Sequence, residues 1–361
     1  MTSRSRDTRG RLRRPRGRCA HTGRVRTTTL RSALPAALIA LSLMLAGCGG
    51  DDGDKKADEK SSKAAPDAPT TWPLTGLDAG GKSVELDHPV IVAKIPNNGE
   101  ADPQAGLSKA DLVVEELVEG GTTRLAAFYY SQLPGDIGPI RSMRASDIGI
   151  VAPVSGVIAT SGAAAQTNER LKKAGVKFYS EGGPGFYRKS GRSAPYDLFT
   201  NLKKVAKAAS DGKDERPADY LPWGSESDLP KGKPATTITA DFGNWSTQWS
   251  FQDGAYANTN SFAAEGDHFN PDSVLVLRVD VVDAGYKDPG GNFVPESKFV
   301  GKGKAQLFHG GQVIDGEWSK SKLDSALSLK TADGDLKVPA GKVWIELVPV
   351  DGKNGSVSYT K

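Results

Sequence analysis

Cysteine and histidine are scarce in this chain of 361 residues, which contains two cysteines and four histidines. Only Cys48 remains beyond the basic leader described below, so the sequence offers no disulfide framework and no thiol catalysis. His88, His268 and His309 lie far apart, and none has a second histidine one helical turn away. The sequence therefore predicts no metal site, and it indicates no cofactor.

Long apolar runs are also missing. The apolar stretch 33–47 is shorter than the roughly 20 residues that a membrane-spanning helix needs. It follows several arginines and ends in Leu45-Ala46-Gly47-Cys48, the order of a bacterial lipobox. We therefore expect residues 1–47 to be a lipoprotein signal peptide. Cys48 would carry the lipid (palmitate) and hold the protein on the extracytoplasmic face of the cell membrane.

The basic part of this leader is unusually long. Residues 25–31 would by themselves form a charged region of ordinary length. Residues 1–24 place 24 further residues before it. One interpretation is that translation starts at Val25 through a GTG codon and that residues 1–24 are a gene-start artefact. The alternative is a twin-arginine export signal at Arg13-Arg14.

Positive charge is confined to the leader. Residues 1–47 contain eleven arginines and one aspartate, a net charge of +10, whereas the whole chain carries +4. The mature chain is therefore acidic, with a net charge of −6. Nucleic-acid binding normally needs a basic patch that displaces counterions from phosphate. The composition thus argues against a nucleic-acid partner.

The mature chain divides by composition into a tether and two domains. Residues 48–71 are rich in Gly, Asp, Lys, Ala and Pro and predict a disordered tether. Residues 72–225 mix strands and helices, which predicts an α/β domain with a mixed sheet. A polar segment rich in Pro and Gly follows, and residues 235–361 read as a mostly β domain. The predicted class is α+β overall.

Individual elements follow from hydrophobic periodicity and turn residues. In the first domain the expected strands are 89–95, 112–118, 123–130, 156–160 and 176–180, and the expected helices are 142–151, 163–174 and 198–209. Gly120-Gly121 should connect two of these strands as a hairpin. In the second domain the expected strands are 236–241, 247–251, 274–282, 304–309 and 343–350, with a hint of helix at 320–327. One of these later strands could complete the sheet of the first domain.

Two motifs suggest chemistry that their surroundings do not support. Gly76–Ser83 matches the P-loop pattern G-x-x-x-x-G-K-[ST], but the tether precedes it and Pro89 leaves no room for the following helix. We interpret it as a glycine turn and predict no nucleotide binding. Ser161 follows a strand, where a nucleophile could lie, but no serine occurs in a G-x-S-x-G elbow. We favour Ser161 as the cap of the next helix.

The densest polar cluster joins the hairpin at Gly120-Gly121 to the segment after Gly138-Pro139. Arg141 and Arg144 lie near an expected helix start, where guanidinium groups and backbone amides together favour an anion. The alternative is that the arginines pair with glutamates of the hairpin and stabilise the domain. The candidate ligand-binding residues are Glu119, Arg124, Arg141, Ser142 and Arg144, and the candidate acid or base residues are Glu116 and Glu119.

At these residues the chain resembles the YerB-like lipoproteins, domain of unknown function 3048. The motifs are PLTGL at 73–77, PQAGLSKAD at 103–111, VEGGTTR at 118–124 and GPIRSMR at 138–144. Segments 301–303, 315–318 and 339–346 are similar to the second domain of the family. Asn258 departs from the pattern, because an arginine is expected two residues after Tyr256. The resemblance implies a two-domain, membrane-anchored lipoprotein and implies no established activity.

Two classes of function remain open from the sequence. The first is an envelope protein that binds a cell-wall polymer, another anionic ligand or a partner protein, in a cleft between its domains. The second is a hydrolase or transferase acting on peptidoglycan, with Glu116 or Glu119 as acid or base. We favour binding, because no nucleophile, metal site or triad is found in the sequence.

Overall fold

The structure, a computed structural model, describes residues 69–350 and 355–361. The predicted signal peptide, Cys48 and all but the last three residues of the predicted tether lie outside these residues. Among the described residues, no helix is long and apolar enough to cross a membrane.

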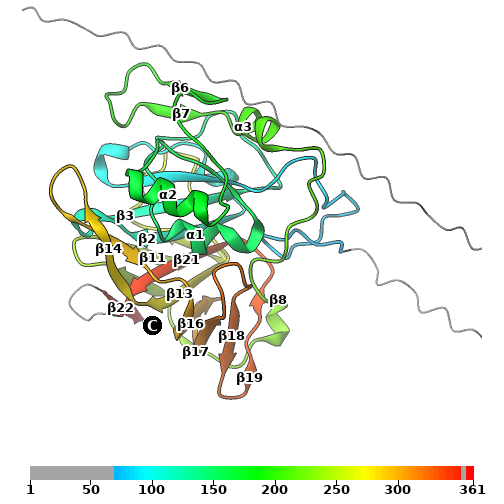
Figure 1. The fold of residues 1–361 in the computed structure, drawn as a ribbon. Helices are drawn as coiled ribbons and strands as arrows, with labels where there is room; N and C mark the ends of the chain where they lie inside the picture. Colours follow the sequence, from blue (N-terminus) through cyan, green and yellow to red (C-terminus); the bar gives the residue numbers. More distant parts are fainter. Residues whose placement is uncertain (1–68, 351–354) are drawn as a thin grey trace, which may run out of the picture. The chain divides into compact units, whose positions relative to one another are not determined.

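A twelve-stranded mixed sheet runs through the described chain (Figure 1). Its order is β19-β18-β17-β16-β13-β21-β2-β3-β1-β4-β5, with β9 paired to β17. The strands of the first half are β1 Ile91–Asn97, β2 Leu112–Leu117, β3 Thr123–Tyr129, β4 Val157–Ala159 and β5 Phe178–Tyr179. Those of the second half are β9 Lys233–Pro234, β13 Ser273–Val279, β16 Gly301–His309, β17 Gln312–Lys320, β18 Ser328–Thr331, β19 Gly334–Asp335 and β21 Val343–Pro349.

Strand β21 joins the two halves of the sheet. It pairs in parallel with β13 of the second half and with β2 of the first half. This confirms that a late strand completes the sheet of the first half. The predicted boundary between an α/β domain at 72–225 and a mostly β domain at 235–361 stays a prediction, because backbone pairing continues from one half into the other.

Two apolar cores lie on opposite faces of this sheet. Alternate residues of β1 enter different cores, with Val92 in one and Ile91 in the other, as the two-residue repeat of a strand requires. The first core includes side chains of α1 Asp147–Val151 and α2 Ala165–Lys173, which are in front of the sheet in Figure 1. The second includes those of α3 Leu202–Ala209.

Smaller sheets and short helices complete the described chain. A four-stranded sheet, ordered β12-β11-β10-β22, contributes to the second core. Its strands are β10 Thr237–Asp241, β11 Ser246–Gln252, β12 Ala255–Asn258 and β22 Ser356–Thr360. Three strand pairs are β14 Val281–Lys287 with β15 Phe293–Ser297, β6 Phe186–Arg188 with β7 Leu198–Thr200, and β8 Trp223–Gly224 with β20 Val338–Pro339. The 3-10 turns are η1 Gly99–Ala101, η2 Leu107–Lys109, η3 Glu119–Gly121, η4 Ala152–Val154 and η5 Glu226–Asp228.

The predicted α+β class is confirmed, as is the hairpin of β2 and β3 around Gly120-Gly121. The helix expected at 142–151 is shorter than predicted and begins at Asp147. The preceding residues bond to distant segments instead, since the Arg141 N–H donates to the Lys94 carbonyl and the Met143 N–H donates to the Gly162 carbonyl. These long-range bonds hold the arginine-bearing segment outside the helix.

Three other expectations need correction. Residues 198–209 form β7 and then α3, because Asn201 caps the helix by accepting from the Lys204 N–H. Residues 321–327 form turns rather than a helix, and Lys320 ends β17. The run 274–282 is divided between β13 and β14.

The P-loop look-alike is a series of turns. Gly76, Gly80 and Gly81 all have positive φ, and within the described residues no strand of a sheet precedes the segment and no helix directly follows it. A single bridge between Thr71 and Asp78 closes the turn. The predicted glycine turn is therefore confirmed.

Candidate functional site

The predicted site residues gather at one edge of the central sheet, namely the edge formed by the carboxyl ends of β1 and β4. β1 and β4 run parallel and end at this edge, and β3 begins here with Arg124 opposite Pro96 of β1. The chain leaves the carboxyl end of β1 toward β2 on one side, and it leaves the carboxyl end of β4 toward β5 on the other side. In open α/β sheets, ligands bind at the carboxyl ends of strands where the order reverses in this way.

A buried charge cluster lies beneath this edge. Lys94 Nζ is 2.8 Å from Glu116 Oε1 and 2.7 Å from Asp147 Oδ1, and all three side chains are 0% exposed. Burial, and then the charge of Asp147, raise the pKa of Glu116. The Arg144 N–H donates to Asp147 Oδ2 over 2.7 Å. The cluster therefore fixes the backbone that carries the arginines, and no external substrate can reach Glu116.

Arg144 is committed to Glu119. Its Nε and Nη2 donate to the two carboxylate oxygens over 2.6 and 2.5 Å, and its Nη1 donates to the Met143 carbonyl over 2.8 Å. The two side chains are only 12% and 11% exposed. Burial alone would lower the pKa of Arg144, but the hydrogen bonds and charge of Glu119 raise it. This forked pair clamps the β2–β3 turn to the segment after Gly138-Pro139.

Replacing Arg144 with lysine is expected to lower the melting temperature by several degrees. Lysine keeps the charge but loses the fork, and charge-assisted hydrogen bonds contribute about 1.5–3 kcal/mol each. Arg188→Lys is the matched control, because the Arg188–Glu181 pair is 44% and 46% exposed and should contribute little. Thermal unfolding of both variants checks this. Equal melting temperatures for Arg144→Lys and the unsubstituted protein would show that the clamp is dispensable.

Arg124 has unused donor capacity. Its side chain donates through Nη1 to the Ser142 carbonyl over 2.6 Å, and the residue is only 7% exposed. Within the part of the chain that the structure describes, its Nε is shielded from solvent and has no hydrogen-bond partner. Burial, and then the nearby charge of Arg144, lower the pKa of Arg124 to about 9. A buried donor without a partner is uncommon in folded proteins, so Arg124 keeps unused hydrogen-bonding capacity beneath this edge.

Arg141 and Ser142 extend the edge outward. The Arg141 guanidinium carbon lies 5.1 Å from the ring centroid of Tyr196, a cation–π contact. Arg141 forms no ion pair with any carboxylate in the described ranges, in contrast to Arg144. Ser142 Oγ is 3.2 Å from Ser161 Oγ. Ser161 is therefore not the cap of α2, whose N-cap is Ala164, and that expectation was wrong.

The local charge balance favours an anion. Four cationic side chains (Lys94, Arg124, Arg141 and Arg144) share this edge with three carboxyl groups (Glu116, Glu119 and Asp147). The raised pKa of Glu116 reduces the opposing charge further. The excess of positive charge lies in a chain whose mature part is acidic.

Sequence reasoning missed Lys94 and Tyr196. A lysine inside the β-branched run 89–95 is the available signal for Lys94, because a charged residue in a buried strand needs partners. No comparable signal marks Tyr196, which reaches Arg141 from a loop 55 positions later in the sequence.

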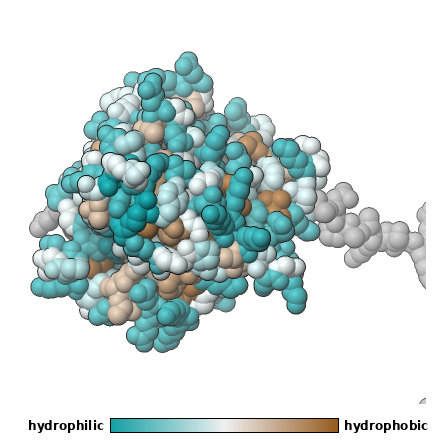
Figure 2. Space-filling view, turned by 90° about the horizontal axis from the view of Figure 1, so that it is seen from above, coloured by the Kyte–Doolittle hydropathy of each residue, from teal (hydrophilic) through white to brown (hydrophobic). Residues whose placement is uncertain are grey.

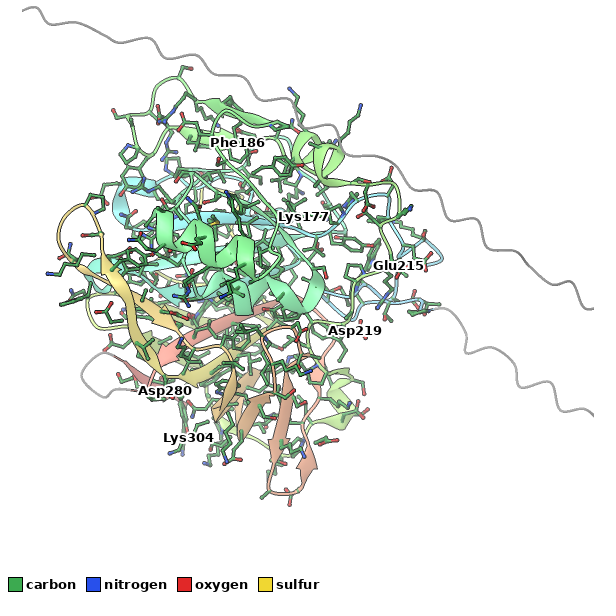
Figure 3. All side chains as sticks on the ribbon, viewed as in Figure 1. Lys177, Phe186, Glu215, Asp219, Asp280 and Lys304 are labelled. Carbon is green, nitrogen blue, oxygen red and sulfur yellow. The ribbon has the colours of Figure 1, made fainter. Side chains whose placement is uncertain are left out.

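A cleft of about 610 Å³ opens beside Glu119. Residues from both halves line it: 117–121, 242–244, 281–283 and 293–295. Phe293 is 64% exposed at the β14–β15 hairpin. A cavity of about 590 Å³ lies at the opposite edge of the sheet, with Lys177 and Glu215, labelled in Figure 3, in its lining. In the described ranges, no group of three or more His, Cys, Asp or Glu residues is arranged to hold a metal ion.

Comparison with known protein families identifies these two halves. The N-terminal domain described as "Protein of unknown function (DUF3048)" matches residues 74–215, and the C-terminal domain of the same family matches residues 237–345. The chain belongs to the DUF3048 family. Asn258, where the resemblance led us to expect an arginine, accepts a hydrogen bond from the Asn260 N–H in this DUF3048 chain.

A relative and a solved structure agree with this assignment. The chain is 27% identical over 289 residues to "Putative lipoprotein YerB" of Bacillus subtilis (strain 168), covering 77% of this chain and 86% of the relative. It is similar in fold to the crystal structure of YerB protein from Bacillus subtilis, with a TM-score of 0.66 and 23% identity. That likeness covers 80% of this chain and 99% of the solved chain. DUF3048 membership thus supports the fold and a lipoprotein character.

Proposed function

We propose that this DUF3048 protein is a lipid-anchored envelope protein that binds an anionic ligand without transforming it. The lipobox at Cys48 and the relative named a putative lipoprotein support anchoring on the extracytoplasmic face of the cell membrane. The ligand would be a carboxylate of a wall peptide or a phosphate of an envelope polymer.

The unpartnered Nε of Arg124 is the observation that carries this proposal. Arg124 is only 7% exposed, yet its Nε–H group has no acceptor among the described residues. Arg141 and the Ser142 hydroxyl lie beside it in the chain segment that Arg124 contacts. Arg144 and Glu119 support the proposed site, because Arg144 donates hydrogen bonds to both carboxylate oxygens of Glu119. Two guanidinium groups and a hydroxyl suit a planar or tetrahedral oxyanion.

The geometry gives less support to a peptidoglycan hydrolase or transferase. Glu116 is 0% exposed and bonded to Lys94, so it cannot touch a polymer. Glu119 accepts from Arg144 through both oxygens, so neither is free to exchange a proton with a substrate. The face shown in Figure 2 is mostly hydrophilic, with small apolar patches between polar ones.

Replacing Arg141 with lysine is expected to weaken binding of purified cell-wall material at least tenfold. The substitution keeps the positive charge and breaks no ion pair found among the described residues, but it removes the forked donor. A lost charge-assisted hydrogen bond of about 1.5–3 kcal/mol corresponds to roughly a tenfold to hundredfold loss of affinity. Co-sedimentation of the full-length protein in detergent with wall material measures this.

Arg188→Lys provides the control for this measurement, because Arg188 already has two carboxylate partners, Glu181 and Asp197, on an exposed surface. Binding by the control should match the unsubstituted protein, and added salt should weaken it for both. Unchanged wall binding by Arg141→Lys, with an unchanged melting temperature, would reject the proposed site.

A further inference from the structure

The buried cluster beneath the arginines brings one amine and two carboxyl groups into contact. Lys94 on β1, Glu116 on β2 and Asp147 on α1 meet in a region with no exposed side-chain surface. Lys94 Nζ contacts both carboxyl groups, at 2.8 and 2.7 Å. The surrounding face of the sheet is apolar: Val92 and Val114 flank the cluster on the same strands, and Ala126 pairs with Lys94.

We propose that Lys94 and Asp147 join through an intramolecular amide bond between Nζ and Cγ, with Glu116 as the catalytic acid and base. This is a self-modification of the folded chain and is independent of ligand binding at the arginines. It needs no co-reactant, because condensation of an amine and a carboxylic acid releases only water.

The atoms and charges balance as follows. The Lys94 ammonium transfers one proton to the Asp147 carboxylate, which gives a neutral amine and a carboxylic acid. The amine nitrogen attacks Cγ, and Glu116 donates a proton to the departing oxygen while it accepts one from the nitrogen. One C–N bond forms, one C–O bond breaks and one water leaves. Glu116 ends protonated, as it began.

Each part of the geometry supports one of these steps. Burial, and then the charge of Asp147, raise the pKa of Glu116. This favours the protonated form, which can act as an acid. The Arg144 N–H, 2.7 Å from Asp147 Oδ2, can stabilise the negative charge that develops on that oxygen. Oδ1, which faces Lys94, is then the oxygen that leaves. Folding holds the amine against the carboxyl group, which replaces an encounter between separate reactants.

Burial also favours the product. An ion pair in an apolar interior carries a desolvation cost of several kcal/mol per ion, and the amide removes both charges. Water is excluded from the cluster, so the reverse hydrolysis lacks its reactant. The bond would tie β1 to α1 across 53 positions of sequence, and with it the segment that carries Arg141 and Arg144.

Mass spectrometry of trypsin-digested, fully unfolded protein tests this proposal. The full-length protein should yield peptide 83–109, uncleaved at Lys94, joined to peptide 145–170, with a mass lower than their sum by one water. Asp147→Asn should give the same joined product, because the carboxamide condenses with release of ammonia. Lys94→Arg and Glu116→Gln should not, whereas the exposed control Glu181→Gln should match the unsubstituted protein.

Normal cleavage after Lys94 and a free peptide 145–170 in the unsubstituted protein would overturn the proposal, and this result needs no variant that folds. A joined product in Glu116→Gln would overturn the assignment of Glu116 as the acid and base. Circular dichroism of each variant shows that a missing product is not the result of a missing fold.

Discussion

Replacing Lys94 with methionine is expected to lower the free energy of unfolding by about 3–5 kcal/mol. The substitution leaves Glu116 and Asp147 in a fully buried position without their cation. Removing one partner of a buried charge cluster is costly because the remaining charges are neither solvated nor paired. Where Lys94 and Asp147 are joined by the proposed amide, the substitution instead removes a covalent cross-link between positions 53 apart, which also lowers stability. Denaturant unfolding at neutral pH measures it.

A compensating variant separates charge from packing. Lys94→Met combined with Glu116→Gln and Asp147→Asn replaces all three ionisable groups at similar volume, and we expect it to recover most of the lost stability, since well-packed neutral groups can replace buried ion pairs. A single Lys94→Met variant within about 0.5 kcal/mol of the unsubstituted protein, the range of ordinary surface substitutions, would contradict the account of this cluster.

Replacing Glu346 with glutamine is expected to remove a loss of stability that the unsubstituted protein shows as the pH rises. Glu346 on β21 lies opposite Glu115 on β2, and both are 0% exposed. Among the described residues, the hydrogen-bond donors to the pair are neutral: Asn97, Thr247, Trp249 and Trp344. Burial, and then the charge of Glu115, raise the pKa of Glu346 well above its ordinary value of 4.5.

The direction of the effect follows from proton linkage. The folded chain keeps a proton on Glu346 that the unfolded chain releases above about pH 4.5. The stabilising contribution is therefore fully present below that pH and is lost as the pH rises through the raised pKa, at about 1.4 kcal/mol per pH unit. Glutamine has nearly the shape of the protonated carboxyl group, but it cannot ionise.

Unfolding free energies measured from pH 5 to pH 9 check this prediction. Glu346→Gln should give a flatter pH dependence than the unsubstituted protein, and the exposed control Glu181→Gln should not. Parallel curves for Glu346→Gln and the unsubstituted protein would show that Glu346 is not protonated in the folded chain.

The sequence predicted local strands well and long-range contacts poorly. The β-branched run 89–95 and the Gly120-Gly121 turn specify β1 and the β2–β3 hairpin through neighbouring residues alone. Strand β17 was missed because polar residues and Gly316 interrupt its apolar pattern. The helix expected from residue 142 begins only at Asp147, because hydrogen bonds from the Arg141 and Met143 N–H groups to distant carbonyls outweigh the local helical spacing. Such bonds depend on tertiary contacts that one sequence does not reveal.

The candidate site shows the same contrast between what local sequence predicts and what long-range contacts decide. Spacing indicated that Glu119, Arg124, Arg141 and Arg144 would cluster, but not which arginine would be paired. The structure pairs Arg144 with Glu119 and leaves Nε of Arg124 unpartnered among the described residues. The partners of Lys94 are 22 and 53 positions away in sequence. Only the folded sheet brings these residues together.

The side-chain signal of the Arg124 Nε–H group tests the proposed binding site most directly. It can be recorded by nuclear magnetic resonance in full-length protein with isotopically labelled arginine, while soluble wall fragments that carry carboxylate or phosphate groups are added. We predict that the signal shifts and that its exchange with water slows as the ligand accepts this hydrogen bond, and that the Arg141→Lys variant needs at least tenfold more fragment. An Arg124 signal that stays unchanged while wall fragments bind to the protein would contradict the account.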